Sequence, residues 1–80
     1  MRATVLVRPK PGILDPQGQA VEGSLGHLGF SVADVRVGRV VDLDVSAGTE
    51  AEARALVERM CEQLLANPLI EGYTIQLEQV

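Results

Sequence analysis

Few residues in this chain have the chemistry of a catalyst. His27 is the only histidine and Cys61 the only cysteine, and no serine or cysteine stands in a local arrangement that would make His27 a general base. Cys61 falls within a helical stripe of apolar residues, where a thiol behaves as a small hydrophobic group. We therefore predict that His27 lies at the surface or against a partner, and that Cys61 belongs to the core.

Two other patterns imitate ligand sites but lack a necessary part. Residues 18–24 follow the glycine spacing of a phosphate-binding loop, yet Ser24 stands where that loop has its lysine. Asp42 and Asp44 alternate along a predicted strand without further metal ligands, so we expect them to be solvated charges. No catalytic, cofactor-binding or metal-binding residue is expected in this chain.

The composition describes one small domain that depends on neighbours. The 80 residues are 46% hydrophobic and 22% charged, which fits a single domain over residues 1–80. A core of this size gives little net stability, and one cysteine cannot form a disulfide within the chain, which fits a reducing compartment. No apolar run suggests a signal peptide or a membrane span, so we expect a soluble cytoplasmic protein stabilised by a partner.

The charge balance argues against nucleic acid as that partner. Seven basic and eleven acidic side chains give a formal net charge of -4, which repels a phosphate backbone. Phe30 and Tyr73 are the only aromatic residues, so the stacking surface of single-strand binders is missing. We expect protein partners, with no binding to nucleic acid or to a membrane.

The first half of the sequence predicts a strand and then a helix. Residues 2–8 alternate in polarity, which indicates a half-buried strand with its odd-numbered residues inward. Asp15 followed by proline predicts a helix N-cap, and Gly29 predicts the end of that helix. The glycines within this helix lower its intrinsic stability, so tertiary packing must hold it.

Three further strands are predicted. The first comprises residues 30–37, with a bulge near residues 33–34 because the apolar parity changes there. The sequence of residues 37–40 then predicts a two-residue hairpin with Gly38 in its turn, leading into a third strand that ends near Val45. Residues 73–80 alternate again and predict a fourth strand.

The second helix is the element with the strongest local signals. Thr49 and Glu52 form a capping box at its start, and Asn67 followed by proline ends it. Its apolar stripe comprises Ala53, Leu56, Val57, Met60, Cys61, Leu64 and Leu65.

The predicted order is that of an α+β, ferredoxin-like βαββαβ fold: an antiparallel sheet with two helices on one face. The other sheet face stays open. Four apolar residues have the parity of that open face: Leu6, Phe30, Val32 and Val40. Since such a patch usually marks an interface, we predict a homodimer or a higher homo-oligomer.

Several short motifs occur in the order that the PurS family has them. They are residues 15–18, 28–30 and 35–39, followed by Cys61, residues 64–71 and Tyr73. The sequence therefore resembles PurS proteins over nearly its whole length. It departs from the family pattern at Arg39, where lysine is frequent, and at Leu69, where valine is frequent; both residues keep the charge or apolar character.

This resemblance implies a small subunit of phosphoribosylformylglycinamidine synthase, an ATP-dependent ligase of purine biosynthesis. In that family the glutaminase subunit PurQ releases ammonia from glutamine, and the synthetase subunit PurL uses ATP and Mg to activate formylglycinamide ribonucleotide. PurS dimers are expected to bridge PurQ and PurL. The chain itself would then bind no cofactor and carry out no step of the reaction.

Two exposed segments are the predicted contact surfaces, because arginine and tyrosine are effective interface anchors. The candidates are Arg36, Gly38, Arg39, Asn67, Pro68, Glu71 and Tyr73. A purely structural interpretation competes with this one, since glycine suits a tight turn and Asn-Pro suits the end of a helix.

Parts of the sequence also fit two other functions. Residues 10–14 resemble the P-G-x-L turn of ACT-type small-molecule sensors. Acylphosphatases share the order of elements, but Pro9 and Pro11 lack the N–H donors that their anion-binding loop requires. Both alternatives explain fewer residues than the PurS resemblance does.

Overall fold

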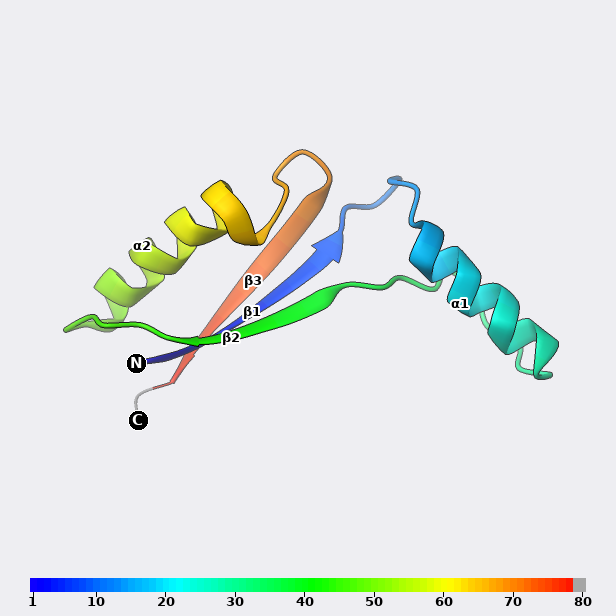
Figure 1. Cartoon of the computed structure of the whole chain (residues 1–80), viewed down its shortest axis with the longest axis horizontal. Helices are drawn as coiled ribbons and strands as arrows, with labels where there is room; N and C mark the ends of the chain where they lie inside the picture. Colours follow the sequence, from blue (N-terminus) through cyan, green and yellow to red (C-terminus); the bar gives the residue numbers. More distant parts are fainter. Residues whose placement is uncertain (79–80) are drawn as a thin grey trace.

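The computed structural model describes residues 1–78 and contains a three-stranded antiparallel sheet and two α-helices (Figure 1). The strands are β1 (Arg2–Pro9), β2 (Arg39–Asp44) and β3 (Glu71–Glu78), in the order β2-β1-β3. The predicted strand over residues 73–80 is confirmed as β3 with an earlier start, and residues 79–80 lie outside the described part of the chain.

The core lies on one face of the sheet, as the alternation of β1 predicts. Ala3, Val5 and Val7 are buried. Val5 pairs with Val41 of β2 and with Ile75 of β3, so aliphatic side chains form a continuous row across the three strands. This row provides the surface on which a helix can pack.

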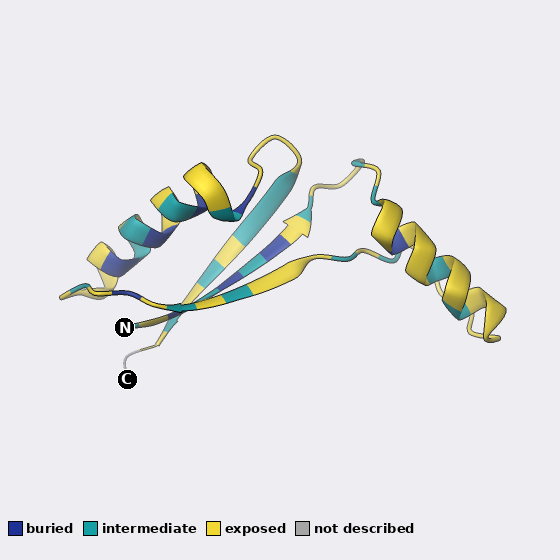
Figure 2. Cartoon of the chain, in the orientation of Figure 1, coloured by how far each residue is buried: buried dark blue, intermediate teal, exposed yellow. Residues whose placement is uncertain are grey.

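Helix α2 (Glu50–Met60) covers that row, and one π-helical turn, η1 (Cys61–Leu65), continues it (Figure 2). The predicted N-cap is confirmed, because the hydroxyl of Thr49 accepts the N–H of Glu52 at 3.1 Å. The buried side chains on the sheet side are Ala53, Val57 and Cys61.

Helix α1 (Pro16–His27) begins and ends where the sequence predicts. A carboxylate oxygen of Asp15 accepts an N–H of the first turn, and Gly29 has a left-handed φ of +94°. The N–H of Phe30 then donates to the carbonyl of Leu25 at 2.9 Å, which is the bond of a Schellman motif.

Although the α+β class and the ferredoxin-like layout are confirmed, α1 does not lie on the sheet. Figure 1 shows it beyond the end of the sheet, and the molecule measures 50 × 27 × 14 Å. Within α1 only Gly18 is buried. The prediction that both helices share one sheet face is therefore wrong, because residues 10–15 carry α1 past the end of β1 (Figure 1). We call residues 10–38, which run out to α1 and back, the arm.

Residues 30–37 are not a strand, contrary to the prediction. They return along α1. Carboxylates of the arm, and not the carbonyls of a neighbouring strand, accept two of their N–H groups. The N–H of Val35 donates to Glu22 at 3.2 Å, and the N–H of Val37 donates to Asp15 at 2.8 Å. These two N–H groups therefore need no acceptor from a neighbouring strand.

The predicted bulge and hairpin, which depended on that strand, are wrong as well. Asp34 has a positive φ of 55° at the place where the bulge was expected, so the parity change marks a local turn. Gly38 leads from the arm into β2 and not between two strands. In residues 1–78 the sheet accordingly has three strands instead of four.

The open sheet face is also less apolar than predicted. Leu6 pairs with Val40, which is 59% exposed, and these two form the apolar part of that face. Phe30 and Val32 lie in the arm instead, so the predicted four-residue patch is wrong in its membership. In the described chain, no helix combines the length and the apolar character that a membrane crossing requires.

Candidate partner-binding site

Three of the predicted site residues meet at one end of the sheet. Arg39 donates from Nη1 to Oε2 of Glu71 at 2.7 Å and from Nη2 to Oε1 at 3.0 Å. Oε1 of Glu71 also accepts the N–H of Asn67 at 2.7 Å, and Nη2 of Arg39 reaches the carbonyl of Leu65 at 2.5 Å. One bidentate pair thus ties the start of β2 to the start of β3 and the end of η1.

Each member of this pair stabilises the charge of the other. The hydrogen bond from Arg39 is the main cause that lowers the pKa of Glu71, and the same bond raises the pKa of Arg39. The Glu71 side chain is 17% exposed, whereas that of Arg39 is 48% exposed. The guanidinium therefore keeps an open side that can meet a partner's acceptor groups.

The connection from η1 to β3 is held by hydrogen bonds throughout. The side chain of Asn67 accepts the N–H of Leu69 at 3.1 Å, and its carbonyl accepts the N–H of Glu71 at 2.7 Å. Lys10, at the end of β1, donates from Nζ to the carbonyl of Pro68 at 2.6 Å. We call this set the sheet-end cluster: Lys10, Arg39, Asn67, Pro68 and Glu71.

Two leucines beside the sheet-end cluster are exposed to solvent. Leu64 and Leu69 are each 83% exposed, and Ile70 is 42% exposed. Leu64 was predicted to belong to the buried stripe of the second helix, and that prediction is wrong because it lies in the π-helical turn, whose wider spacing takes it off the stripe. Two exposed leucines, one in η1 and one on the hydrogen-bonded connection that follows it, are suited to insert into a partner's apolar pocket.

Gly38 has a structural role that differs from the predicted turn. A Cβ at this position would lie 3.2 Å from the carbonyl carbon of Val7 and closer still to its oxygen. Only glycine lets the start of β2 come this close to β1. Gly38 therefore sets the position of Arg39 and offers no side chain to a partner.

Tyr73 lies outside the sheet-end cluster. Its hydroxyl donates to Oε1 of Glu62 at 2.9 Å, which joins β3 to η1. This hydrogen bond is the main cause that raises the pKa of Tyr73 to about 12. The ring packs against the core, so Tyr73 supports η1 more than it offers contact surface.

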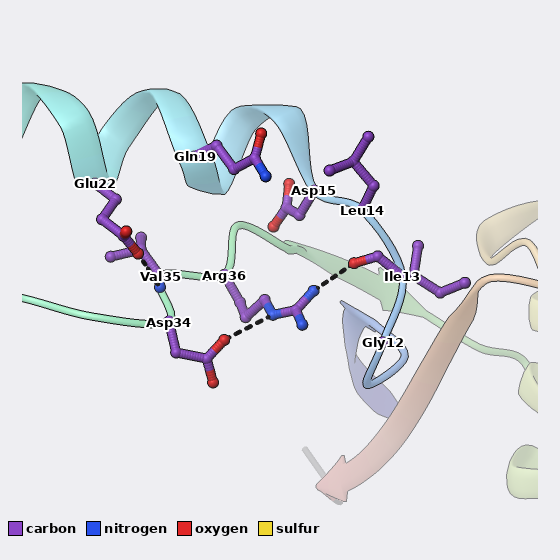
Figure 3. A pocket seen from close by; sticks show the side chains of 9 residues that line it. All are labelled: Gly12, Ile13, Leu14, Asp15, Gln19, Glu22, Asp34, Val35 and Arg36. Atoms are coloured by element: carbon purple, nitrogen blue, oxygen red, sulfur yellow. Dashed lines mark hydrogen bonds and ion pairs between the residues drawn. The ribbon is translucent and has the colours of Figure 1, made fainter.

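Arg36 also lies apart from Arg39, although only two residues separate them. Its Nη1 donates to the carbonyl of Ile13 at 2.7 Å, and its Nε pairs with Asp34 at 3.4 Å (Figure 3). These groups line a hollow of about 380 Å³ between the two legs of the arm. The predicted surface around Arg36, Gly38 and Arg39 is thus divided between two places.

A second hollow, of about 460 Å³, connects those places. The start of the arm and the start of β2 form two sides of it, and Ile70 and Glu71 form another. Leu14 contributes an apolar side chain that is 69% exposed. Leu14 was not among the predicted contact residues, and the only sequence signal at this position is the P-G-x-L pattern of residues 11–14.

The residues excluded as catalysts lie as expected. Cys61 is fully buried, and burial is the main cause that raises the pKa of its thiol, so its assignment to the core is confirmed. His27 is exposed at the end of α1. Among residues 1–78, no group of three histidine, cysteine or acidic side chains could hold a metal ion.

The acidic residues of β2 are cross-strand partners. Asp42 accepts the hydroxyl of Thr4 at 2.7 Å, and Asp44 pairs with Arg2 at 3.4 Å. All of these groups lie on the open sheet face at the surface, which confirms the prediction of solvated charges.

The chain matches one protein family along nearly its whole length. The family model described as "PurS: Phosphoribosylformylglycinamidine (FGAM) synthase" matches residues 2–79. The chain is similar to the PurS subunit of Methanocaldococcus jannaschii, with 36% identity over 99% of this chain and 96% of that protein. It is also similar to the PurS subunit of Bacillus subtilis, with 39% identity over 99% of this chain and 94% of that protein.

Solved structures agree. A structure of Bacillus subtilis PurS has a TM-score of 0.86 at 38% identity and covers 98% of each chain. A chain in a structure named PurLQS, from Thermotoga maritima, has a TM-score of 0.85 at 30% identity and covers 94% of this chain and 93% of that one.

Proposed function

The chain belongs to the PurS family of phosphoribosylformylglycinamidine synthase, a ligase, and from that premise we propose that it bridges the glutaminase subunit PurQ and the synthetase subunit PurL. The observation that carries this proposal is the sheet-end cluster, which is rigidly bonded and yet presents two leucines with 83% of their surface in water. A rigid surface loses little conformational entropy when it binds. That property suits a scaffold.

In this proposal the other subunits carry out the chemistry. PurQ releases ammonia from glutamine, and PurL uses ATP and Mg to convert formylglycinamide ribonucleotide into formylglycinamidine ribonucleotide. Residues 1–80 act as one domain in the cytoplasm. They supply contact surface and no reacting group.

The partner surface combines the residues named from the sequence with those that the geometry adds. Arg39 and Asn67 provide polar contacts, and Leu64, Pro68 and Leu69 provide apolar ones. Gly38, Glu71 and Tyr73 position these groups from within, through the close approach, the ion pair and the hydrogen bond described above. Arg36 instead stabilises the arm through its contacts with Ile13 and Asp34.

We further propose that the chain forms a homodimer or a higher homo-oligomer through α1. The arm carries exposed apolar residues, including Val21 at 41%, Leu28 at 73% and Phe30 at 59%. A net charge of -4 repels a second copy over most of the surface, but α1 contains a single carboxylate, Glu22, which already accepts the N–H of Val35. Two copies can therefore meet along α1 with little like-charge repulsion.

The test uses three single variants and purified PurQ and PurL. Arg39→Ala is expected to weaken assembly of the three-subunit complex on a sizing column and to lower the glutamine-dependent rate. Arg36→Ala should affect self-association more, and Arg59→Ala, an exposed arginine of α2, is the matched control. Activity with free ammonia should persist in each case, because PurL then needs no bridge.

If Arg39→Ala leaves both assembly and the glutamine-dependent rate equal to those of Arg59→Ala, the sheet-end cluster is not the partner surface. If the ammonia-dependent and glutamine-dependent rates fall together, the subunit does more than bridge.

A small-molecule role has one observation in its favour, the hollow of about 380 Å³ within the arm. Calorimetry of the isolated chain with amino acids and with nucleotides separates the two functions. A sensor of the ACT type should release or absorb heat with one of them, whereas a bridging subunit should not.

A further inference from the structure

One carboxylate joins the start of α1 to the end of the returning leg. Oδ1 of Asp15 accepts the N–H of Gly18 at 3.0 Å, and Oδ2 accepts the N–H of Val37 at 2.8 Å (Figure 3 labels Asp15 beside the start of α1). The first bond caps α1. The second bond holds the returning leg just before it enters β2, so one side chain links the start of the helix to the sheet.

Such a link matters because α1 has no packing of its own against the sheet. Gly18 is the only buried residue within α1. We propose that Asp15 is a latch that fixes the direction of α1 relative to the sheet and so presents the apolar side of α1 to a second copy of the chain.

Neighbouring contacts point the same way. A Cβ at Gly18 would overlap the carbonyl oxygen of Val35, so the returning leg passes as close to α1 as glycine allows. Glu22 accepts the N–H of Val35 at 3.2 Å, and Arg36 crosses back to the carbonyl of Ile13 at 2.7 Å. Asp15 adds a bond to each leg, one to Gly18 in the helix and one to Val37 just before β2.

The protonation of Asp15 agrees with this geometry. Its pKa is lowered, and the hydrogen bond from the N–H of Val37 is the largest cause, ahead of the bond from Gly18. Both hydrogen bonds favour the charged form of this carboxylate, as the geometry requires.

The decisive variant separates capping from latching. Asp15→Ser keeps one oxygen for the N–H of Gly18, since serine is as good an N-cap as aspartate, but leaves none for Val37. Asp44→Ser removes the same charge from the exposed sheet face and is the control. Amide hydrogen exchange by NMR on the full chain reports each N–H separately.

We expect exchange at Val37 to become roughly tenfold faster in Asp15→Ser, with little change at Gly18, because only the second bond is lost. Exchange at Val37 in Asp44→Ser should equal that of the wild type. If Val37 stays as protected in Asp15→Ser as in the control, the latch does not exist.

The presentation of α1 to a second copy depends on the proposed homo-oligomer, so it is measured separately. Sedimentation of Asp15→Ser should give a self-association constant weakened by about tenfold or more. If the N–H of Val37 exchanges faster but self-association is unchanged, the latch does not contribute to dimer formation. If the wild type itself never associates, the proposed oligomer fails while the exchange result still stands.

Discussion

Replacement of Gly38 tests whether the close approach of β2 to β1 positions the sheet-end cluster. In Gly38→Ala the new methyl group would lie 3.2 Å from the carbonyl carbon of Val7 and closer to its oxygen, whereas ordinary contacts begin at 3.4 Å. A backbone carbonyl cannot rotate away as a flexible side chain can. The start of β2 must therefore shift, and Arg39 shifts with it.

The size of the effect follows from three contributions. Overpacking costs about 1–3 kcal/mol. Loss of a ladder hydrogen bond where Val7 pairs with Arg39 costs about 1 kcal/mol. The reduced freedom of the unfolded chain offsets about 0.4–1 kcal/mol. The free energy of unfolding should therefore fall by about 1–3.5 kcal/mol, from a total of about 4–12 kcal/mol for a chain of this length.

Urea unfolding at a fixed protein concentration measures this change. Gly72→Ala is the matched control, because Gly72 pairs with Arg8 at the same end of the sheet and a Cβ there meets nothing within 4 Å. The control should be neutral or slightly stabilised. If Gly38→Ala unfolds within about 0.5 kcal/mol of Gly72→Ala, the close approach does not constrain the strand.

Three further predictions concern single interactions. Tyr73, the only tyrosine, should titrate spectroscopically near pH 12, and Glu62→Gln should lower that pKa. Since the folded pKa lies above the ordinary tyrosine pKa of 10.0, the stability from this bond is complete below pH 10 and is lost as the pH rises toward 12. A wild-type pKa near 10 would contradict the hydrogen bond. Cys61 should resist thiol reagents in the native protein and react fully in urea, so rapid native labelling would show that it is not buried. Thr49→Ala should lower the free energy of unfolding by about 1 kcal/mol while Thr49→Ser should not, and equal stability of the two variants would rule out the cap.

Sequence alone predicted the features that depend on neighbours along the chain. The alternation of residues 2–8 identified the central strand and its buried face, because side chains of a strand point alternately to its two sides. Asp15, Gly29 and Thr49 marked the helix ends, because capping groups bond within a few residues. The short motifs around these positions also indicated the PurS family.

The candidate site was only partly predictable. The sequence analysis named Arg39, Asn67, Pro68 and Glu71 as candidates, but it could not tell that Arg39 pairs with Glu71 while Arg36 turns to the carbonyl of Ile13. Nor did it identify Lys10 as a tie to Pro68. Such contacts join segments far apart in the chain, and local spacing carries no information about them.

Residues 30–37 mark the limit most clearly. Their apolar character suits an edge strand as well as an extended leg, and both conformations leave backbone N–H groups in need of acceptors. The sequence by itself determined only that this segment would not continue the helix that Gly29 terminates. Only the tertiary structure decided which groups bond to this segment. Because α1 stands off the sheet, the carboxylates of Asp15 and Glu22 accept the N–H groups of Val37 and Val35, and no neighbouring strand supplies those two acceptors.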